Sequence, residues 1–263
     1  DELRALHEHC SYVKYSCATI FTETWLRETI ADSATELHGK TLHRADRDKD
    51  NSGGKGKGGG LGIYIRDEWC RNARVVSDHC SPELEHLAVK CRPFYMPREF
   101  SCVYINAVYI TPASIPGADQ KAALNTLHDH VNKQLTTAPE AAIIVAGDFN
   151  HADLKSMLPK FYQHVKCATR GKNTLDMVYT NVKQAYRAIP MPHIGKADHT
   201  PVALIPTYTS VRRREPIVSK RTTTWPANAT SSLQLSLHDT RWEELKHQDL
   251  EQYTTSVVQH IKT

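Results

Sequence analysis

The chain has 263 residues, of which 40% are hydrophobic, and this is enough to bury the core of one large α/β domain, with or without a tail. Its formal net charge of +4 is compatible with a phosphate-bearing partner but does not demonstrate one. No apolar run is long enough to cross a membrane, and the first residues do not resemble a signal peptide. We therefore expect an intracellular protein with no membrane partner.

The seven cysteines are scattered along the chain, and no two of them form a Cys-x-x-Cys pair. An odd number at this spacing suits neither a zinc site nor a small disulfide framework. We expect reduced thiols of the kind found in intracellular proteins.

The first half of the chain shows one helical pattern, two strand patterns and a glycine-rich loop between the strands. Residues 2–14 have helical spacing, with Leu3, Leu6 and Val13 as possible core contacts. Residues 16–21 are short, apolar and β-branched, which predicts a buried strand. Six of the eight residues from Gly53 to Gly60 are glycine, which predicts a mobile surface loop before a strand at 61–65.

The second half alternates strands and one long helix. Residues 84–91 and 100–109 alternate like neighbouring strands, and 118–135 have helical periodicity. The fully apolar run at 141–146 predicts a central strand, and two short strands are expected at 174–179 and 201–205. This order of elements predicts a layered α/β domain.

The composition changes after Tyr208. Residues 211–216 and 220–224 are rich in arginine, lysine and threonine and predict a basic, solvated linker, in which the arginines at 212–214 could equally bind nucleic acid. Helical periodicity returns at 242–261. We therefore predict a domain over 1–208, followed over 209–263 by a basic linker and short helices.

Several chemically active residues stand where apolar strands are expected to end. Because strand ends of an α/β sheet converge on one edge, where ligands usually bind, the set is more informative than any member. Taken alone, each acidic residue is more often a turn or helix-cap residue. A lone histidine is more often a surface residue or a hydrogen-bonded core residue. The set comprises Glu23, Tyr109, Asp148 with Asn150, Asp176, and Asp198 with His199.

The set matches what hydrolysis of a phosphodiester requires. A carboxylate such as Glu23 can hold the divalent cation that neutralises phosphoryl charge. Asp148 can orient or deprotonate the attacking water, with the Asn150 amide beside it. His199 can stabilise the transition state, and Asp176 can fix its imidazole and raise its pKa.

Four motifs in this order resemble those of the endonuclease/exonuclease/phosphatase superfamily. They are Thr-Glu-Thr-Trp-Leu at 22–26, Gly-Asp-Phe-Asn at 147–150, Thr-Leu-Asp at 174–176 and Ala-Asp-His at 197–199. Three segments are similar in sequence to the endonuclease domain of LINE-type (non-LTR) retrotransposons. They are residues 21–26, residues 44–47 before Gly-Gly-Gly-Leu at 58–61, and residues 147–151. The resemblance covers about residues 1–208, and the tail resembles the stretch that leads to a reverse transcriptase.

The resemblance implies a fold, an activity and a cofactor. The fold would be a four-layer α/β sandwich, in which two packed mixed sheets are flanked by helices. The activity would be a DNA nick that leaves a 3′-hydroxyl, with Mg²⁺ or Mn²⁺ and no small-molecule cofactor. We accordingly expect DNA as the partner, a monomer, and a nuclear location for an active protein.

The resemblance also implies a role for each matched residue. Glu23 would bind the metal, and Asp198 would lie beside it. Tyr109 and Thr169 would contact the phosphate, and Asp148 would activate the water with Asn150 as its partner. His199 would be the catalytic histidine, and Asp176 would support it.

The chain departs from the family pattern at two places. The family's first motif is a strand ending in asparagine ahead of the first helix, and no candidate for that asparagine precedes Glu23. We therefore expect the first strand to be missing, which would expose the edge of a neighbouring strand. Ala197 stands where the family usually has serine, which removes one hydroxyl donor.

Two alternatives remain open at the level of the sequence. A phosphomonoesterase or phospholipid-cleaving member of the superfamily would carry a Trp-Cys-Asp-Arg type motif where this chain has Thr-Leu-Asp-Met at 174–177, and this difference favours DNA. A catalytically inactive remnant that at most binds nucleic acid is favoured by the expected loss of the first strand.

The lysines at 55 and 57 could touch DNA phosphates or belong to a solvated loop.

Overall fold

The structure, a computed structural model, describes residues 2–54, 58–210 and 224–262. The chain divides into two compact units, Asp1–Arg212 and Arg213–Thr263, here called the first and the second unit. The possible DNA contacts at Lys55, Lys57 and 212–214, and all of the predicted basic linker except Thr224, lie outside the described residues.

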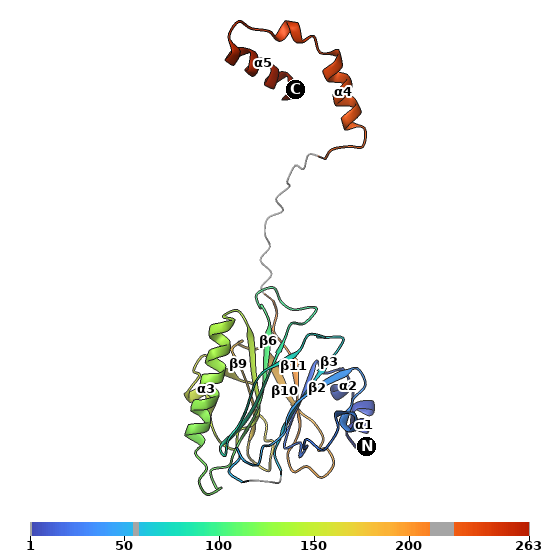
Figure 1. Ribbon diagram of the computed structural model, residues 1–263. Coiled ribbons are helices and arrows are strands. Elements are labelled where there is room, and N and C mark those ends of the chain that lie inside the picture. Colours follow the sequence, from blue (N-terminus) through green and yellow to red (C-terminus); the bar gives the residue numbers. More distant parts are fainter. Residues whose placement is uncertain (1, 55–57, 211–223, 263) are drawn as a thin grey trace. The chain divides into compact units, whose positions relative to one another are not determined.

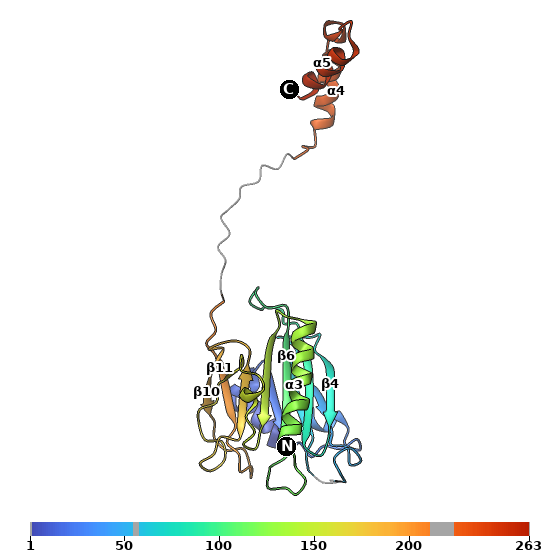
Figure 2. The same cartoon turned by 90° about the vertical axis from the view of Figure 1, so that its left-hand side faces the viewer.

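The first unit consists of four layers (Figure 1). Helix α3 (Gln120–Thr137) covers one face of a six-stranded sheet, and a second β layer packs on the other face. The short helices α1 (Glu2–His9) and α2 (Ser11–Tyr15) lie outside that second layer. Figure 2 shows α3 running along the strands that it covers. The arrangement confirms the predicted α/β sandwich.

The six-stranded sheet has the order β4-β5-β6-β7-β9-β8, in which only β6 and β7 are parallel. Its strands are β4 (Arg74–Cys80), β5 (Leu84–Cys91), β6 (Val103–Ile110), β7 (Ala142–Asp148), β8 (Tyr162–Gln163) and β9 (Asp176–Thr180). Strands β5 and β6 are buried almost throughout because α3 and the second β layer cover both faces. The predicted central strand at 141–146 is β7, which confirms that assignment.

The second β layer is divided into two separate sheets. One has the order β1-β3-β2, with β1 (Ala18–Thr22), β2 (Lys40–Ala45) and β3 (Leu61–Arg66), and the other pairs β10 (Tyr186–Pro190) with β11 (Val202–Pro206). Both sheets pack on the six-stranded sheet, with Ile20, Val202 and Leu204 against Ala146 and Val178.

The strand predicted as buried at 16–21 is instead the edge strand β1. All five of its residues are only half-buried, because β3 is its one hydrogen-bonded neighbour among the described strands. The helix expected over 2–14 breaks at Cys10, and of its expected core residues only Val13 is buried. Leu3 and Leu6 are half-buried, while His7 is buried instead.

The glycine-rich stretch is not a surface loop along its whole length. Gly59 and Gly60 are buried, and their carbonyl oxygens accept hydrogen bonds from the backbone N–H groups of Trp25 and Thr24, at 2.8 and 3.1 Å. A side chain at Gly60 would lie 2.7 Å from the Thr24 hydroxyl, so the close approach requires glycine. This stretch therefore fixes the segment that follows β1.

The second unit contains α4 (Ala229–Asp239), η3 (Trp242–Leu245) and α5 (Leu250–Lys262). The helix expected over 242–261 is thus interrupted between η3 and α5, and α4 was not predicted. None of these three elements has a buried residue. In the part of the chain that the structure describes, no helix combines the length and apolarity needed to cross a membrane.

Candidate active site

Four polar side chains occupy one row across the six-stranded sheet. Glu85 of β5 pairs with Tyr109 of β6, Tyr109 with Asp148 of β7, and Asp148 with Asp176 of β9. Side chains at paired positions project from the same face of a sheet. Asp176 begins its strand rather than ending it, and the antiparallel direction of β9 brings it to the edge where β6 and β7 end.

Asp148 is positioned by a close approach of two strands. At the preceding residue, Gly147, φ is +150°, and an added Cβ atom would lie 1.9 Å from the carbonyl oxygen of Val108. Only glycine can occupy that position without moving β6. The Asp148 carboxylate accepts a hydrogen bond from the Asn150 backbone N–H at 3.0 Å. The Gly-Asp-Phe-Asn motif therefore builds a rigid turn at the end of β7.

Asn150 is buried and held in the left-handed backbone region, with φ of +44°. The side-chain Nδ2 of Asn150 donates a hydrogen bond to the Ile110 carbonyl at 2.8 Å, and the backbone carbonyl of Asn150 accepts one from Gln120 Nε2 at 2.7 Å. With Nδ2 engaged, Oδ1 is the amide atom available to a water or a ligand.

The environment of Asp148 favours its protonated form. Burial, followed by the neighbouring Asp176 and then Glu23, raises the pKa of Asp148 to about 6, against the lowering effects of the Asn150 N–H and His199. A carboxyl group with a pKa near neutrality can both accept and release a proton. This is the property that a general base for water requires.

His199 and Asp176 form a hydrogen-bonded pair. His199 Nδ1 lies 2.7 Å from Asp176 Oδ2, and both side chains are about one quarter exposed, at 26% and 27%. The bond to Asp176 raises the pKa of His199, and burial opposes this rise. With Nδ1 engaged, Nε2 is the ring nitrogen left for a substrate oxygen.

Thr169 lies behind this pair rather than at the surface. It is fully buried, and its hydroxyl accepts hydrogen bonds from the backbone N–H groups of Leu175 and Asp176, at 2.9 and 3.0 Å. Its carbonyl accepts from the N–H of Thr200 at 2.6 Å. These bonds let Thr169 position Asp176 and the segment after His199, and its predicted contact with a phosphate stays a prediction.

Asp198 forms an ion pair with Arg170. The Oδ2 atom of Asp198 lies 2.5 Å from Arg170 Nη2, and the Asp198 side chain is 66% exposed. The expectation that Asp198 lies beside a metal therefore competes with an arginine that the sequence reasoning did not single out. Arg170 directly follows Thr169, and that adjacency is the one signal that pointed to it.

Glu23 and Tyr109 meet on the other side of Asp148. Glu23 directly follows β1, is exposed, and has φ of +53°, a strained conformation for a residue with a side chain. Burial, followed by the Glu23 carboxylate that accepts a hydrogen bond from the tyrosine hydroxyl, raises the pKa of Tyr109 to about 12. Tyr109 therefore remains a neutral hydrogen-bond donor near pH 7.

Arg47 and Glu85 support this side of the site. They form a largely buried ion pair, and the second carboxylate oxygen of Glu85 accepts the Gly60 N–H at 2.8 Å. The Arg47 guanidinium lies 5.5 Å from the centre of the Tyr109 ring. Sequence reasoning missed both roles, although a glutamate inside the apolar strand at 84–91 was a visible signal.

Comparisons with known proteins address the fold. No family model matches the sequence, and the comparison with curated proteins found no match. The structure is similar to the human Nocturnin catalytic domain with bound sulfate anion, at 12% identity and a TM-score of 0.52 over 78% of this chain and 86% of that one. It is also similar to D. rerio TDP2 complexed with single strand DNA product, at 12% identity and a TM-score of 0.52 over 77% and 90%.

A third similar structure is an endonuclease/exonuclease/phosphatase family protein from Bacteroides thetaiotaomicron, at 12% identity and a TM-score of 0.51 over 77% of this chain and 87% of that one. The chain has the endonuclease/exonuclease/phosphatase fold. The motif resemblance at superfamily level is thus matched by the fold, whereas the finer resemblance to LINE-type endonucleases stays a prediction.

In this endonuclease/exonuclease/phosphatase fold, the side chains near Asp148 suit a hard divalent cation. Glu23 and Asp148 provide carboxylate oxygens close enough to influence one another. Among the described residues no three His, Cys, Asp or Glu side chains gather closely enough to enclose a metal ion. Mg²⁺ is usually held by one or two carboxylates together with waters, so this donor set fits Mg²⁺ better than an ion that needs a closed cage.

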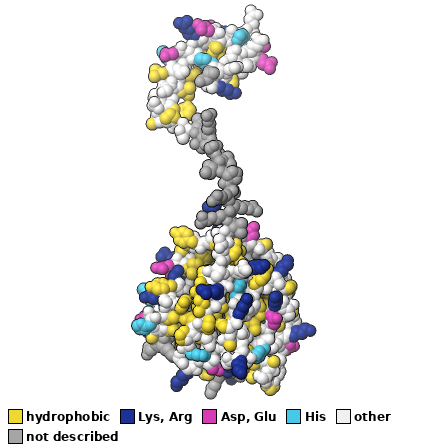
Figure 3. Space-filling view, turned by 180° about the vertical axis from the view of Figure 1, so that it is seen from behind, with side chains coloured by type: hydrophobic (Ala, Val, Ile, Leu, Met, Phe, Trp, Pro, Cys, Tyr) yellow, Lys and Arg dark blue, Asp and Glu magenta, His cyan; other side chains and the backbone are white. Residues whose placement is uncertain are grey.

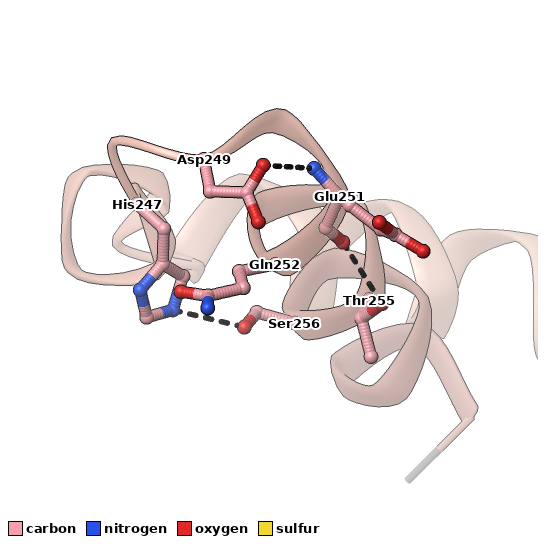
Figure 4. Close-up of a pocket in the computed structure, with 6 residues that line it drawn as sticks. All are labelled: His247, Asp249, Glu251, Gln252, Thr255 and Ser256. Atoms are coloured by element: carbon pink, nitrogen blue, oxygen red, sulfur yellow. Dashed lines mark hydrogen bonds between the residues drawn. The ribbon is translucent and has the colours of Figure 1, made fainter.

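A separate hollow lies in the second unit and is shown in Figure 4. It is lined by His247, Asp249, Glu251, Gln252, Thr255 and Ser256. Its polar groups bond one another, as in the 3.0 Å contact between Ser256 and His247 Nε2. It belongs to elements without a buried residue, so we assign it no site.

Proposed function

We propose that the first unit is a metal-dependent phosphodiesterase that nicks DNA and leaves a 3′-hydroxyl, and that it derives from a LINE-type retrotransposon. The observation that carries the proposal is the junction of Asp148, Asp176 and His199, in which a carboxyl group with a pKa near 6 lies beside a histidine–aspartate pair. Hydrolysis of a phosphodiester needs a base for water and a donor for the phosphoryl oxygens.

Asp148 would act on the attacking water. The water oxygen forms the new bond to phosphorus, its proton passes to the Asp148 carboxylate, and the bond from phosphorus to O3′ breaks, after which O3′ takes a proton from solvent water. Asn150 Oδ1 can accept a hydrogen bond from the same water, since Nδ2 is held by the Ile110 carbonyl. The product is a 5′-phosphate beside a free 3′-hydroxyl.

His199 and Tyr109 would act as donors. The raised pKa of His199 favours the imidazolium form, whose Nε2–H can donate to a phosphoryl oxygen as negative charge develops there. Tyr109, with a pKa of about 12, keeps its proton and can donate it in a hydrogen bond to the phosphate or to the leaving O3′.

Mg²⁺ or Mn²⁺ held by Glu23, beside the Asp148 carboxylate that serves as the base, would supply the positive charge that offsets the phosphate. The combined negative charge of Glu23, Asp148 and Asp176 would attract the hydrated cation. Glu23 is exposed and therefore open to a hydrated ion.

DNA as the substrate is supported by likeness and by charge. One structure of the same fold, D. rerio TDP2, holds a single strand DNA product, and another, the human Nocturnin catalytic domain, holds a sulfate anion. Figure 3 shows Lys and Arg side chains spread over one face of the first unit. Together with the net charge of +4, they favour a polyanionic partner.

A plasmid-nicking assay with Mg²⁺ tests the proposal. The unaltered chain should convert supercoiled plasmid to the open circle, His199→Ala should lose this activity, and His128→Ala on the remote helix α3 should retain it. A DNA polymerase should extend the nicked strand directly, because it needs a free 3′-hydroxyl. Equal nicking by the unaltered chain and His199→Ala, or nicking by neither, would refute the catalytic assignment.

A further inference from the structure

Trp25 presents an aromatic ring to solvent beside the acidic cluster. It is 61% exposed, whereas the large hydrophobic side chains of the first unit's strands are mostly buried. It follows Glu23 by two residues, so the two Cα atoms lie at most about 7 Å apart. An exposed indole this close to the site contributes little to the core.

The backbone of Trp25 is held in place. Its φ is +56°, and its N–H donates to the Gly59 carbonyl at 2.8 Å. Together with Glu23 it gives two left-handed residues within three positions, a conformation that persists only when the surroundings enforce it. Gly59 in turn packs so closely on Arg47 that it has no room for a side chain.

The indole rests on a glycine. A Cβ atom added to Gly58 would lie 3.7 Å from the Cε2 and Nε1 atoms of Trp25 and 3.7 Å from a guanidinium nitrogen of Arg47. The edge of the indole therefore lies within van der Waals reach of Gly58, with the Arg47 guanidinium close by. The result is a supported ring that remains open to solvent.

We infer that Trp25 is a stacking platform for a nucleobase of the bound strand, next to the phosphodiester at the acidic cluster. The inference rests on the proposed function and deepens it by naming a contact to the base. A nucleobase has the flat π-face that stacks on indole, while its phosphate is the group that a carboxylate-bound cation attracts. No hydrogen bond to a base edge is needed, so the platform would accept any base.

Fluorescence anisotropy with a labelled single-stranded phosphorothioate oligonucleotide tests this directly, with Mg²⁺ present, because the modified linkages resist hydrolysis and binding is then measured without cleavage. Trp25→Ala should weaken binding about tenfold, since base–aromatic stacking is worth roughly 1–3 kcal/mol per base. Trp25→Phe should retain most of the affinity. Tyr95→Ala is the matched control, because Tyr95 is 94% exposed but lies in the connection from β5 to β6, at the opposite end of β6 from Tyr109.

A second probe separates stacking from charge. On a sugar-phosphate strand of the same length without bases, the unaltered chain and Trp25→Ala should bind equally. The inference is overturned if Trp25→Ala binds the oligonucleotide as the unaltered chain does, if Tyr95→Ala loses as much affinity, or if the loss persists on the strand without bases. The unaltered chain's failure to cleave any phosphodiester would refute the proposed function alone, since the binding comparison is independent of cleavage.

Discussion

The Nδ1 atom of His199 lies 2.7 Å from the Oδ2 atom of Asp176, and Asp176 is paired in register with Asp148 on the neighbouring strand. A segment just before β11 and two adjacent strands of the six-stranded sheet thereby bring a histidine and two carboxyl groups together. The hydrogen bond to Asp176 raises the pKa of His199, whereas burial and then the neighbouring Asp176 raise the pKa of Asp148.

Replacing Asp176 by asparagine should lower the pKa of His199, because the amide cannot stabilise the imidazolium as the carboxylate does. The nicking rate should fall about 100-fold as the ring loses its orienting partner. NMR titration of the His199 ring and single-turnover nicking measure the two effects. An unchanged His199 pKa in Asp176→Asn would show that the contact has no electrostatic role.

Replacing Gly147 by alanine should destabilise the first unit by at least about 3 kcal/mol, because the added Cβ would meet the Val108 carbonyl at 1.9 Å. Gly39→Ala is the control, since Gly39 also has a positive φ of +72° but no atom near the added Cβ, and should cost only about 1 kcal/mol. Urea unfolding measures both. Equal losses in the two variants would place the whole effect in backbone strain.

Breaking the Arg47–Glu85 pair should cost about 3–5 kcal/mol in either single variant, Arg47→Met or Glu85→Leu, because each removes one half of a largely buried ion pair. The double variant should be more stable than the sum of the single losses predicts. A double-mutant cycle in denaturant measures the coupling. Additive losses would mean that the two charges are independently solvated.

The stability of the first unit should fall on acidification because of His86, which is fully buried on β5. Its Nε2 lies 2.9 Å from Asn106 Oδ1, and its ring centre lies 4.7 Å from that of His130. Burial lowers the pKa of His86 from 6.5 to about 4. The unfolded chain therefore binds the additional proton first, so stability is complete above pH 6.5 and declines as the pH falls towards 4.

The full loss from this one group is on the order of 3 kcal/mol. Denaturant unfolding of the unaltered chain and of His86→Asn between these pH values measures it, with the slope against pH as the readout rather than the absolute stability. Equal slopes in the two proteins would assign the acid sensitivity to other groups.

The sequence predicted the strands whose apolar pattern is continuous or alternating and missed those whose apolar pattern is interrupted by charged or polar residues. The strand at 84–91 was predicted at its observed bounds because both of its faces are covered. Strand β4 was missed because only its two valines form an apolar stretch, and β2 because lysine, histidine and arginine interrupt its apolar pattern. Partner strands, rather than local sequence, stabilise these segments.

Sequence order selected Asp148, Asp176 and His199, and the structure brings these three together. The order of motifs in the sequence could not select Glu85 or Arg47, because their roles come from strand register and from contacts between residues far apart in the chain. The exposure of Asp198 and the burial of Thr169 depend equally on tertiary packing. Motifs thus identify candidate residues, while the fold determines which of them can reach a substrate.

The central claim is that Asp148 is the base of a phosphodiester hydrolase. Its most direct test is single-turnover cleavage of a DNA duplex with Mg²⁺ by the unaltered chain, by Asp148→Asn, and by Asp67→Asn as a control. The half-buried Asp67 carboxylate accepts a hydrogen bond from the Thr41 hydroxyl. We predict that Asp148→Asn is slower by at least about 100-fold, and that Asp67→Asn cleaves at the unaltered rate. Cleavage by Asp148→Asn at the rate of the unaltered chain would contradict the account.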